Sequence, residues 1–142
     1  MFNPNPKPQK DKMTSTEFRE LWGSKNRKKK KYNNKSKTYT TSIYGTRTFD
    51  SIKEAQYCEE LDFLLLHGDI KHYYLQYKID ITINGVHWRN YYIDFKLINK
   101  DDSITYVEVK GYATEVWKMK WDAVLIQRDE LLESGAELIV IK

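Results

Sequence analysis

The strongest constraint on the fold of this chain is a β-rich segment from Tyr73 to Ile98, which is interrupted only by the dipeptide Asn84-Gly85. On both sides of the dipeptide the segment is rich in Ile, Thr, Tyr and Trp, residues that pack well on a pleated surface. Asn-Gly is the strongest short signal for a two-residue hairpin turn, because both residues tolerate positive φ angles. The segment therefore predicts a long antiparallel hairpin, around which the other elements must be arranged.

Helix signals lie on both sides of this hairpin. Ser51 and Glu54 have the spacing of a capping box, and the apolar periodicity that follows them ends at Gly68. A second helix is predicted from Thr114, as its N-cap, to a stop at Gly135. Shorter strand signals lie at residues 37–42, 46–49, 103–110 and 136–142. The order β-β-α-β-β-β-α-β predicts an α/β fold in which two main helices flank a mixed central sheet.

The positive charge of the chain is concentrated at its N-terminal end. Residues 1–37 hold twelve Lys and Arg against three acids, a net of +9, whereas residues 38–142 have a net of −5. With three prolines and no apolar periodicity at its start, the segment 1–37 is predicted to be a largely disordered arm, in which residues 14–22 can form one short helix. A phosphate-bearing partner would explain the arm, and a merely solvated tail would explain it equally well.

Size and composition limit the remaining classes. A chain of 142 residues suits one domain with a real core, predicted here at residues 38–142. It has no run of eighteen apolar residues and no apolar stretch at its start, so we expect no membrane association and a cytoplasmic location. The single cysteine, Cys58, can form neither an internal disulfide nor a thiolate zinc cluster.

Two acidic residues on neighbouring strands are the first candidates for chemistry. Side chains alternate with a period of two, so Asp94 lies on the strand face opposite to Ile93 and Phe95. On the next strand Glu108 and Lys110 share a face. If the connecting loop is symmetric, Asp94 lies directly opposite Glu108.

Such a pair of carboxylates needs a positive partner. Directly opposed residues have Cβ atoms ~4.5–5.5 Å apart, a distance at which like charges are destabilising. Mg²⁺ meets the need, because it is commonly bound by one or two carboxylates, waters and substrate phosphate. Lys110 could hold a water or a phosphate oxygen beside the ion. Taken singly, Asp94 and Glu108 could each be a solvated strand acid paired with a neighbouring base, and only their joint arrangement favours the metal.

A third acid is selected by the helical pattern after Ser51. At ~100° per residue, Glu54 falls on the same inward face as Cys58 and Leu61. This segment alone favours an ordinary capping role for Glu54 over a functional one, and the two roles can coexist where a helix begins near the sheet.

The succession of Glu54, Asp94 and Glu108-Val109-Lys110 resembles the PD-(D/E)XK nuclease superfamily, in which the core is a helix, a three-stranded antiparallel meander, a helix and a strand. Ile93 stands where the superfamily name has proline. A closer resemblance, to a small phage-encoded family of that superfamily, extends from about Met13 to the C-terminus. It rests on the segments KYNNK, FDSIKEAQYCEEL, YYIDF and VEVKGYATEVWKMK.

The resemblance implies a restriction-endonuclease-like core and Mg²⁺-dependent hydrolysis of DNA phosphodiester bonds, with Mn²⁺ able to substitute. It implies Asp94 and Glu108 as metal ligands, the Val109 carbonyl as a third, an assisting role for Glu54, and Lys110 orienting the attacking water. A structure-selective phage enzyme such as a Holliday junction resolvase, acting as a homodimer in the host cytoplasm, is the expected type.

DNA contacts are predicted from lysines on the arm and on the second helix, namely Lys28, Lys29, Lys30, Lys31, Lys118 and Lys120. Trp117 and Trp121, at i and i+4 on that helix, are more typical of core residues than of stacking platforms. Two other functions stay open at this point. One is a monomeric nicking or end-processing nuclease, and the other is a nucleic-acid-binding protein with a vestigial site.

Overall fold

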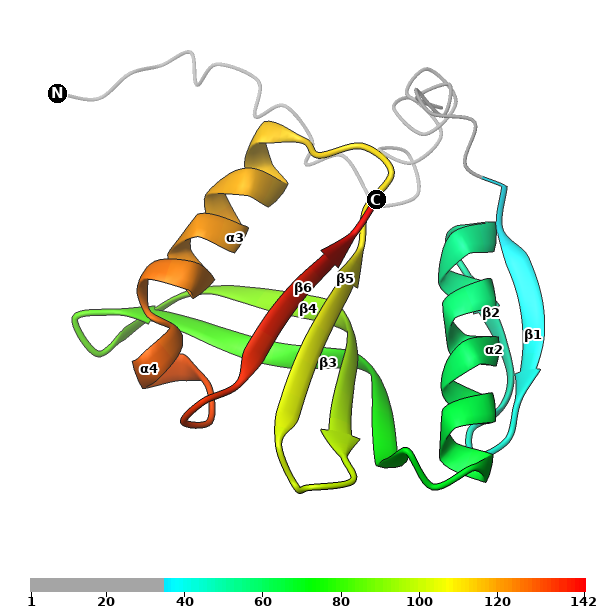
Figure 1. Ribbon diagram of the computed structural model, residues 1–142. Coiled ribbons are helices and arrows are strands. Elements are labelled where there is room, and N and C mark those ends of the chain that lie inside the picture. Colours follow the sequence, from blue (N-terminus) through cyan, green and yellow to red (C-terminus); the bar gives the residue numbers. More distant parts are fainter. Residues whose placement is uncertain (1–34) are drawn as a thin grey trace, which may run out of the picture. The chain divides into compact units, whose positions relative to one another are not determined.

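The computed structural model describes residues 35–142 (Figure 1). The helix predicted at 14–22 and the four lysines at 28–31 lie outside these residues. The elements, in chain order, are β1 Lys37–Thr41, β2 Gly45–Phe49, α2 Ile52–Leu66, β3 Ile70–Ile83, β4 Val86–Asn99, β5 Ile104–Val109, α3 Glu115–Ile126, α4 Arg128–Leu131 and β6 Glu137–Ile141. The first strand thus begins one residue before the predicted domain. None of the helices in the described part is long and apolar enough to cross a membrane.

The long hairpin is confirmed. Strands β3 and β4 have 14 residues each and pair antiparallel along their length. At the turn, Asn84 has φ 51° and Gly85 has φ 76°. Two successive positive φ angles are what a type I′ turn requires, so the Asn-Gly dipeptide sets the turn for the reason that its sequence indicates.

The main sheet is mixed and has the strand order β3-β4-β5-β6, in which only β5 and β6 are parallel. Strands β1 and β2 form a separate two-stranded sheet beside α2. Helix α2 lies on one side of the main sheet, and α3 and α4 lie on the other (Figure 1). The predicted class, α/β with helices flanking a mixed sheet, is therefore confirmed.

The second helix differs from its prediction. It begins as expected, because the Thr114 side chain accepts a hydrogen bond of 3.2 Å from the Trp117 N–H. One continuous helix to Gly135 was expected, but α3 ends at Ile126 and the short α4 follows after Gln127. After this break Leu132 is buried in the core, with 8% of its surface exposed.

The buried apolar residues form two clusters. The α2-side cluster consists of Phe49, Ala55, Cys58, Leu61, Ile70, Tyr73, Phe95, Leu97, Val107 and Val109. The α3-side cluster consists of Ile79, Ile81, Tyr91, Ile93, Tyr106, Trp121, Val124, Leu132 and Ala136. The β3–β4 hairpin thus supplies one cluster with the half nearer its open end and the other with the half nearer its turn.

The change from one cluster to the other occurs at Gln76 and Asp94. Phe95 packs in the α2-side cluster and Ile93 in the α3-side cluster, although a regular strand would place both in one core. On β3 the backbone of Gln76 has φ 47°, in the left-handed region, and this interrupts the regular pleat. The prediction that Ile93 and Phe95 share one face was therefore wrong, because alternation holds only while the strand stays regular.

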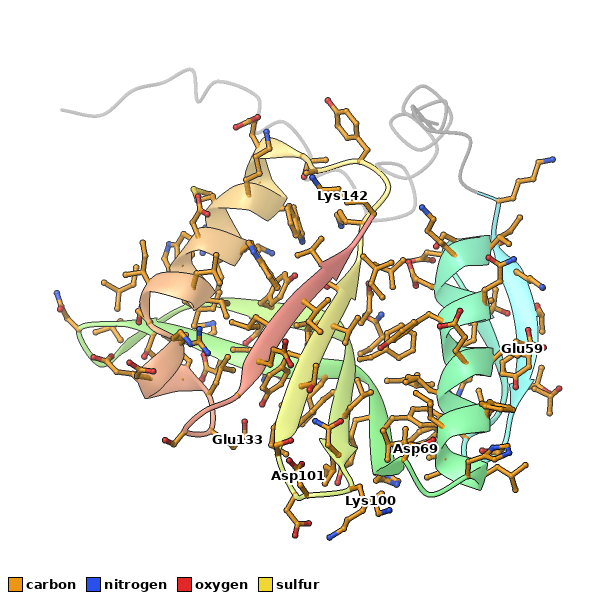
Figure 2. All side chains as sticks on the ribbon, viewed as in Figure 1. Glu59, Asp69, Lys100, Asp101, Glu133 and Lys142 are labelled. Carbon is orange, nitrogen blue, oxygen red and sulfur yellow. The ribbon has the colours of Figure 1, made fainter. Side chains whose placement is uncertain are left out.

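A buried lysine is neutralised at one edge of the α3-side cluster. Only 9% of the Lys96 side chain is exposed, and its Nζ lies 2.6 Å from Glu133 Oε1. The Tyr106 hydroxyl donates to Glu133 Oε2 at 2.5 Å, and Lys96 Nζ lies 4.2 Å from the centroid of the Tyr77 ring. Glu133 comes from the segment between α4 and β6 (Figure 2). This network fastens that segment to three strands of the sheet.

The Lys96 network predicts an asymmetric response to mutation. Glu133→Gln should lower the free energy of unfolding by about 2–3 kcal/mol, because it leaves the Lys96 ammonium buried without its counter-ion. Lys96→Met should cost less than about 1 kcal/mol, since the 44% exposed Glu133 side chain can be hydrated. Urea denaturation at pH 7, with Glu130→Gln as the matched exposed control, measures both. Equal losses for the two variants would contradict this account.

Candidate functional site

The predicted register between β4 and β5 is confirmed where the two strands pair. Lys96 lies opposite Tyr106, and Ile98 lies opposite Ile104. The ladder ends one residue earlier than the predicted acid pair, at Phe95 opposite Val107. From this point towards the β3–β4 turn, β4 leaves β5, so the two strands form a fork.

The predicted carboxylates close this fork. Asp94 Oδ2 accepts a hydrogen bond of 2.9 Å from the Val109 N–H. In return, Glu108 Oε2 accepts one of 3.3 Å from the Asp94 N–H. Each acid therefore accepts a hydrogen bond from a main-chain N–H of the opposite strand. The interaction fixes both side chains side by side at the point where the strands separate.

Glu108 is the more deeply buried of the two, with 3% of its surface exposed. Its Oε1 accepts from Trp117 Nε1 at 3.1 Å and lies 3.6 Å from Lys110 Nζ. Burial raises the pKa of Glu108 above its ordinary value, and the charge of Asp94 raises it further. Lys110 and a hydrogen bond from Tyr91 oppose this rise but do not cancel it.

Asp94 is half-buried and has both oxygens occupied. Besides the bond to Val109, its Oδ1 accepts a hydrogen bond of 2.9 Å from Gln76 Nε2. Burial raises the pKa of Asp94, although the donors Val109 and Gln76 and the charge of Lys110 act in the opposite direction. Both carboxyls are thus held in an environment that disfavours two negative charges.

Glu54 lies in the first turn of α2, where it takes part in the N-cap and lines a cavity beside Asp94. The Ser51 hydroxyl accepts a hydrogen bond of 3.1 Å from the Glu54 N–H, so Ser51 is the N-cap. The Glu54 carboxylate faces the same cavity as Asp94. Burial, followed by the charges of Asp94 and Asp50, raises the pKa of Glu54 from 4.5 to about 7.

A cavity of about 510 Å³ lies against Asp94 on the α2 side. Its polar lining consists of Arg47, Asp50, Glu54, Gln76 and Asp94, with Tyr44 and Thr48 at its β1–β2 wall. The Arg47 guanidinium forms no hydrogen bond or ion pair with residues 35–142. The cavity thus offers space beside the acids for part of a ligand, together with one cationic side chain.

Lys110 is placed by the last strand of the sheet. Its N–H donates to the Ile141 carbonyl at 2.7 Å, which continues the parallel pairing of β5 with β6. Its Nζ lies 3.6 Å from Glu108 Oε1 and 5.4 Å from the centroid of the Trp117 ring. The ammonium group is therefore held beside the acid pair.

The predicted residues of α3 have different surroundings. Trp121 is in the α3-side cluster, as predicted, and the Trp117 ring stacks on it with centroids 5.6 Å apart. Trp117 also donates to Glu108, so it supports the site directly. Lys118 is exposed and pairs with Glu115 at 3.1 Å, whereas Lys120 is half-buried. Neither lysine belongs to the acid cluster.

Sequence reasoning did not find Gln76 as a partner of Asp94. Counting from the Asn84-Gly85 turn, as Ile83 opposite Val86 requires, places Leu75 opposite Asp94. A β-bulge between Ile81 and Thr82 shifts the register by one residue and brings Gln76 into that position. No signal in the sequence marks this bulge.

The donor set fits Mg²⁺ better than a closed structural metal site. Within residues 35–142, no group of three or more His, Cys, Asp or Glu side chains could hold a metal ion. Two carboxylates are adjacent, however, and the Val109 N–H points towards Asp94. In an extended strand the N–H and C=O of one residue point to the same edge, so the Val109 carbonyl also lies on this side. Mg²⁺ is usually bound by one or two carboxylates and completes its coordination with water or phosphate.

Fold and site together define an α/β domain with a buried acid pair and a lysine at a forked strand edge. The model of the family described as protein of unknown function (DUF1064) matches residues 29–131. The chain therefore belongs to this family. No curated protein and no solved structure matches it.

The acid cluster predicts a stability that depends on pH. Between pH 4.5 and about 7 the folded protein retains a proton on Glu54 that the unfolded chain has lost, so the free energy of unfolding falls as pH rises. Glu54→Gln should remove this contribution. We expect the variant to be more stable than the wild type by about 1–2 kcal/mol at pH 8, after allowance for partial exposure, and to equal it at about pH 4.

Urea denaturation without divalent cations measures the difference at both pH values. Glu59→Gln, an exposed acid on the same helix, is the matched control. A difference that is the same at both pH values would show that Glu54 does not carry the unfavourable charge.

Proposed function

We propose that this protein is a Mg²⁺-dependent DNA endonuclease whose active site is of the PD-(D/E)XK type. The observation that carries the proposal is the pair of half-buried Asp94 and buried Glu108, joined by crossed hydrogen bonds at the fork, with Lys110 beside it. Burying adjacent carboxylates is costly unless a cation compensates them. A divalent cation is the compensation that hydrolysis of a phosphodiester also needs.

The element order supports the same proposal. Helix α2, the meander β3–β4–β5, helix α3 and strand β6 follow the order of the PD-(D/E)XK core that the sequence resembles. The acids fall on the second and third strands of the meander, and Glu54 falls on the preceding helix. On this basis we assign a restriction-endonuclease-like core.

The residues have distinct roles in the proposed reaction. Asp94, Glu108 and the Val109 carbonyl would hold Mg²⁺, or Mn²⁺ in its place. The ion, when bound, makes a water more nucleophilic and neutralises charge on the phosphate. Lys110, fixed beside Glu108, orients the attacking water. Glu54 assists from the cavity side of Asp94.

The proposed substrate is branched DNA, such as a Holliday junction. The chain is small, and residues 38–142 contain no evident element for reading base edges, so recognition of shape and backbone is favoured. Lys118 and Lys120 on α3 and the lysines at 28–31 are the proposed phosphate contacts. A homodimer would supply the two sites that symmetric cutting of two strands needs.

Substitution of a proposed metal ligand, or of the lysine proposed to orient the water, should strongly reduce cleavage. We expect Asp94→Asn and Lys110→Met each to lower the rate at least about 100-fold, because a metal site contributes several kcal/mol of transition-state stabilisation. The assay compares labelled four-way junction, linear duplex and single-stranded DNA in Mg²⁺. The exposed Asp122→Asn and Lys100→Met are the matched controls and should retain full activity.

The same assay separates the rival functions. Binding without metal-dependent cutting of any substrate would favour a nucleic-acid-binding protein with a vestigial site. Nicking or end trimming of the linear duplex by a protein that is monomeric in solution would favour a nicking or end-processing nuclease. Cleavage that survives Asp94→Asn would refute the assigned site.

From the charge of the basic arm we predict that part of the affinity for DNA depends on the salt concentration. Deletion of residues 1–37 should weaken binding and flatten the plot of log K against log salt, because fewer phosphates are neutralised. Fluorescence anisotropy with Asp94→Asn as the parent measures binding without cutting. An unchanged slope would show that the arm is a solvated tail.

A further inference from the structure

Gln76 has a backbone conformation that glutamine rarely adopts inside a strand. Its φ of 47° lies in the left-handed region, which non-glycine residues mostly avoid. The pairs on either side, Leu75 with Phe95 and Tyr77 with Ile93, keep the same register. The irregularity is therefore confined to Gln76, at the position that faces Asp94. Outliers of this kind gather at functional sites, where the surrounding structure maintains them.

This backbone conformation of Gln76 is accompanied by one specific side-chain contact, with Asp94. The Gln76 Nε2 donates to Asp94 Oδ1 at 2.9 Å, while the Val109 N–H holds Oδ2 of the same carboxylate. Donors on both oxygens fix the rotation of the carboxylate plane. Each oxygen has a second lone pair, so this arrangement leaves Asp94 able to bind a cation.

The uncharged side-chain amide of Gln76 also suits the acidic residues around it. Glu54 and Asp50 line the same cavity as Gln76 and Asp94, and Glu108 lies on the other side of Asp94. A carboxylate at position 76 would add another negative charge to this group, and an ammonium would compete with a bound cation. A neutral donor orients Asp94 without changing the net charge of the site.

From these observations we propose that Gln76 is a positioning residue, which holds the Asp94 carboxylate in the orientation that binds the divalent cation. The inference rests on the proposed function, because it assumes that Asp94 is a ligand. The alternative is that Gln76 only bends strand β3. In that case the left-handed backbone of Gln76 would matter and its side-chain amide would not.

Two substitutions separate the amide from the backbone. Gln76→Met keeps the length of the side chain and removes the donor. Gln76→Gly also removes the donor but relaxes the left-handed backbone, so its melting temperature should be at least that of Gln76→Met. Gln56→Met, at an exposed glutamine on α2, is the matched control.

The test is calorimetric titration of each full-length protein with Mn²⁺ alone, followed by the Mn²⁺ dependence of cleavage. We expect both Gln76 variants to bind Mn²⁺ about 10-fold more weakly than the wild type and the Gln56→Met control, as loss of outer-shell partners usually produces. Their cleavage rates should return towards the wild-type rate when Mn²⁺ is raised about 10-fold. That recovery is not expected of a protein that has merely lost its fold.

Each of the other possible results refutes either the role of Gln76 or the proposed function. If the wild type binds Mn²⁺ and both variants bind it equally well, the role of Gln76 is refuted and the proposed function stands. If Gln76→Gly retains affinity that Gln76→Met loses, the backbone matters rather than the amide, and the role is again refuted. If the wild type itself binds no Mn²⁺ and cuts no DNA, the proposed function fails, and the role of Gln76 fails with it.

Discussion

The crossed hydrogen bonds between β4 and β5 are the interaction on which the rest of the site depends. A β-ladder that stops leaves donors unpaired on both strands, and buried donors must find acceptors. Here the acceptors are Asp94 and Glu108, each bound to a main-chain N–H of the other strand. The same two bonds thus link the two strands where their ladder ends and bring two carboxylates together. Apolar side chains could pack at this position but could not satisfy the donors.

The fork lies where the two cores meet. One half of the long hairpin packs with α2 and the other with α3, and the acids stand at the transition. Their burial therefore comes from both sides, which explains why the pKa values of Glu54, Asp94 and Glu108 all shift upwards. Elsewhere in the sheet the buried charge of Lys96 is balanced by Glu133 within the chain. Within residues 35–142 the acid pair has one ion-pair partner, Lys110, whose Nζ lies 3.6 Å from Glu108 Oε1, so its charge is not balanced to the same degree.

Much of the fold and part of the site could be predicted from local patterns in the sequence. Asn84-Gly85 predicted the turn, Ser51 and Thr114 predicted the helix starts, and loop symmetry predicted the register of Lys96 with Tyr106. What could not be predicted depends on tertiary packing. The bulge at Ile81 and Thr82, the left-handed Gln76 and the end of α3 at Ile126 have no marker in the residues themselves. Consequently alternation assigned Ile93 to the wrong core, and Gln76 escaped notice.

The pairing of Lys110 with Ile141 has a consequence for the timing of assembly. The residues proposed to do chemistry all lie between positions 54 and 110, yet β6, which fixes Lys110, is made some thirty residues later. A nascent chain that has exposed only the helix and the meander holds the acids without the strand that aligns their lysine. The proposed site is therefore complete only when strands β5 and β6 have paired. For the nuclease proposed above, the site would in this way stay incomplete while the chain is still being synthesised.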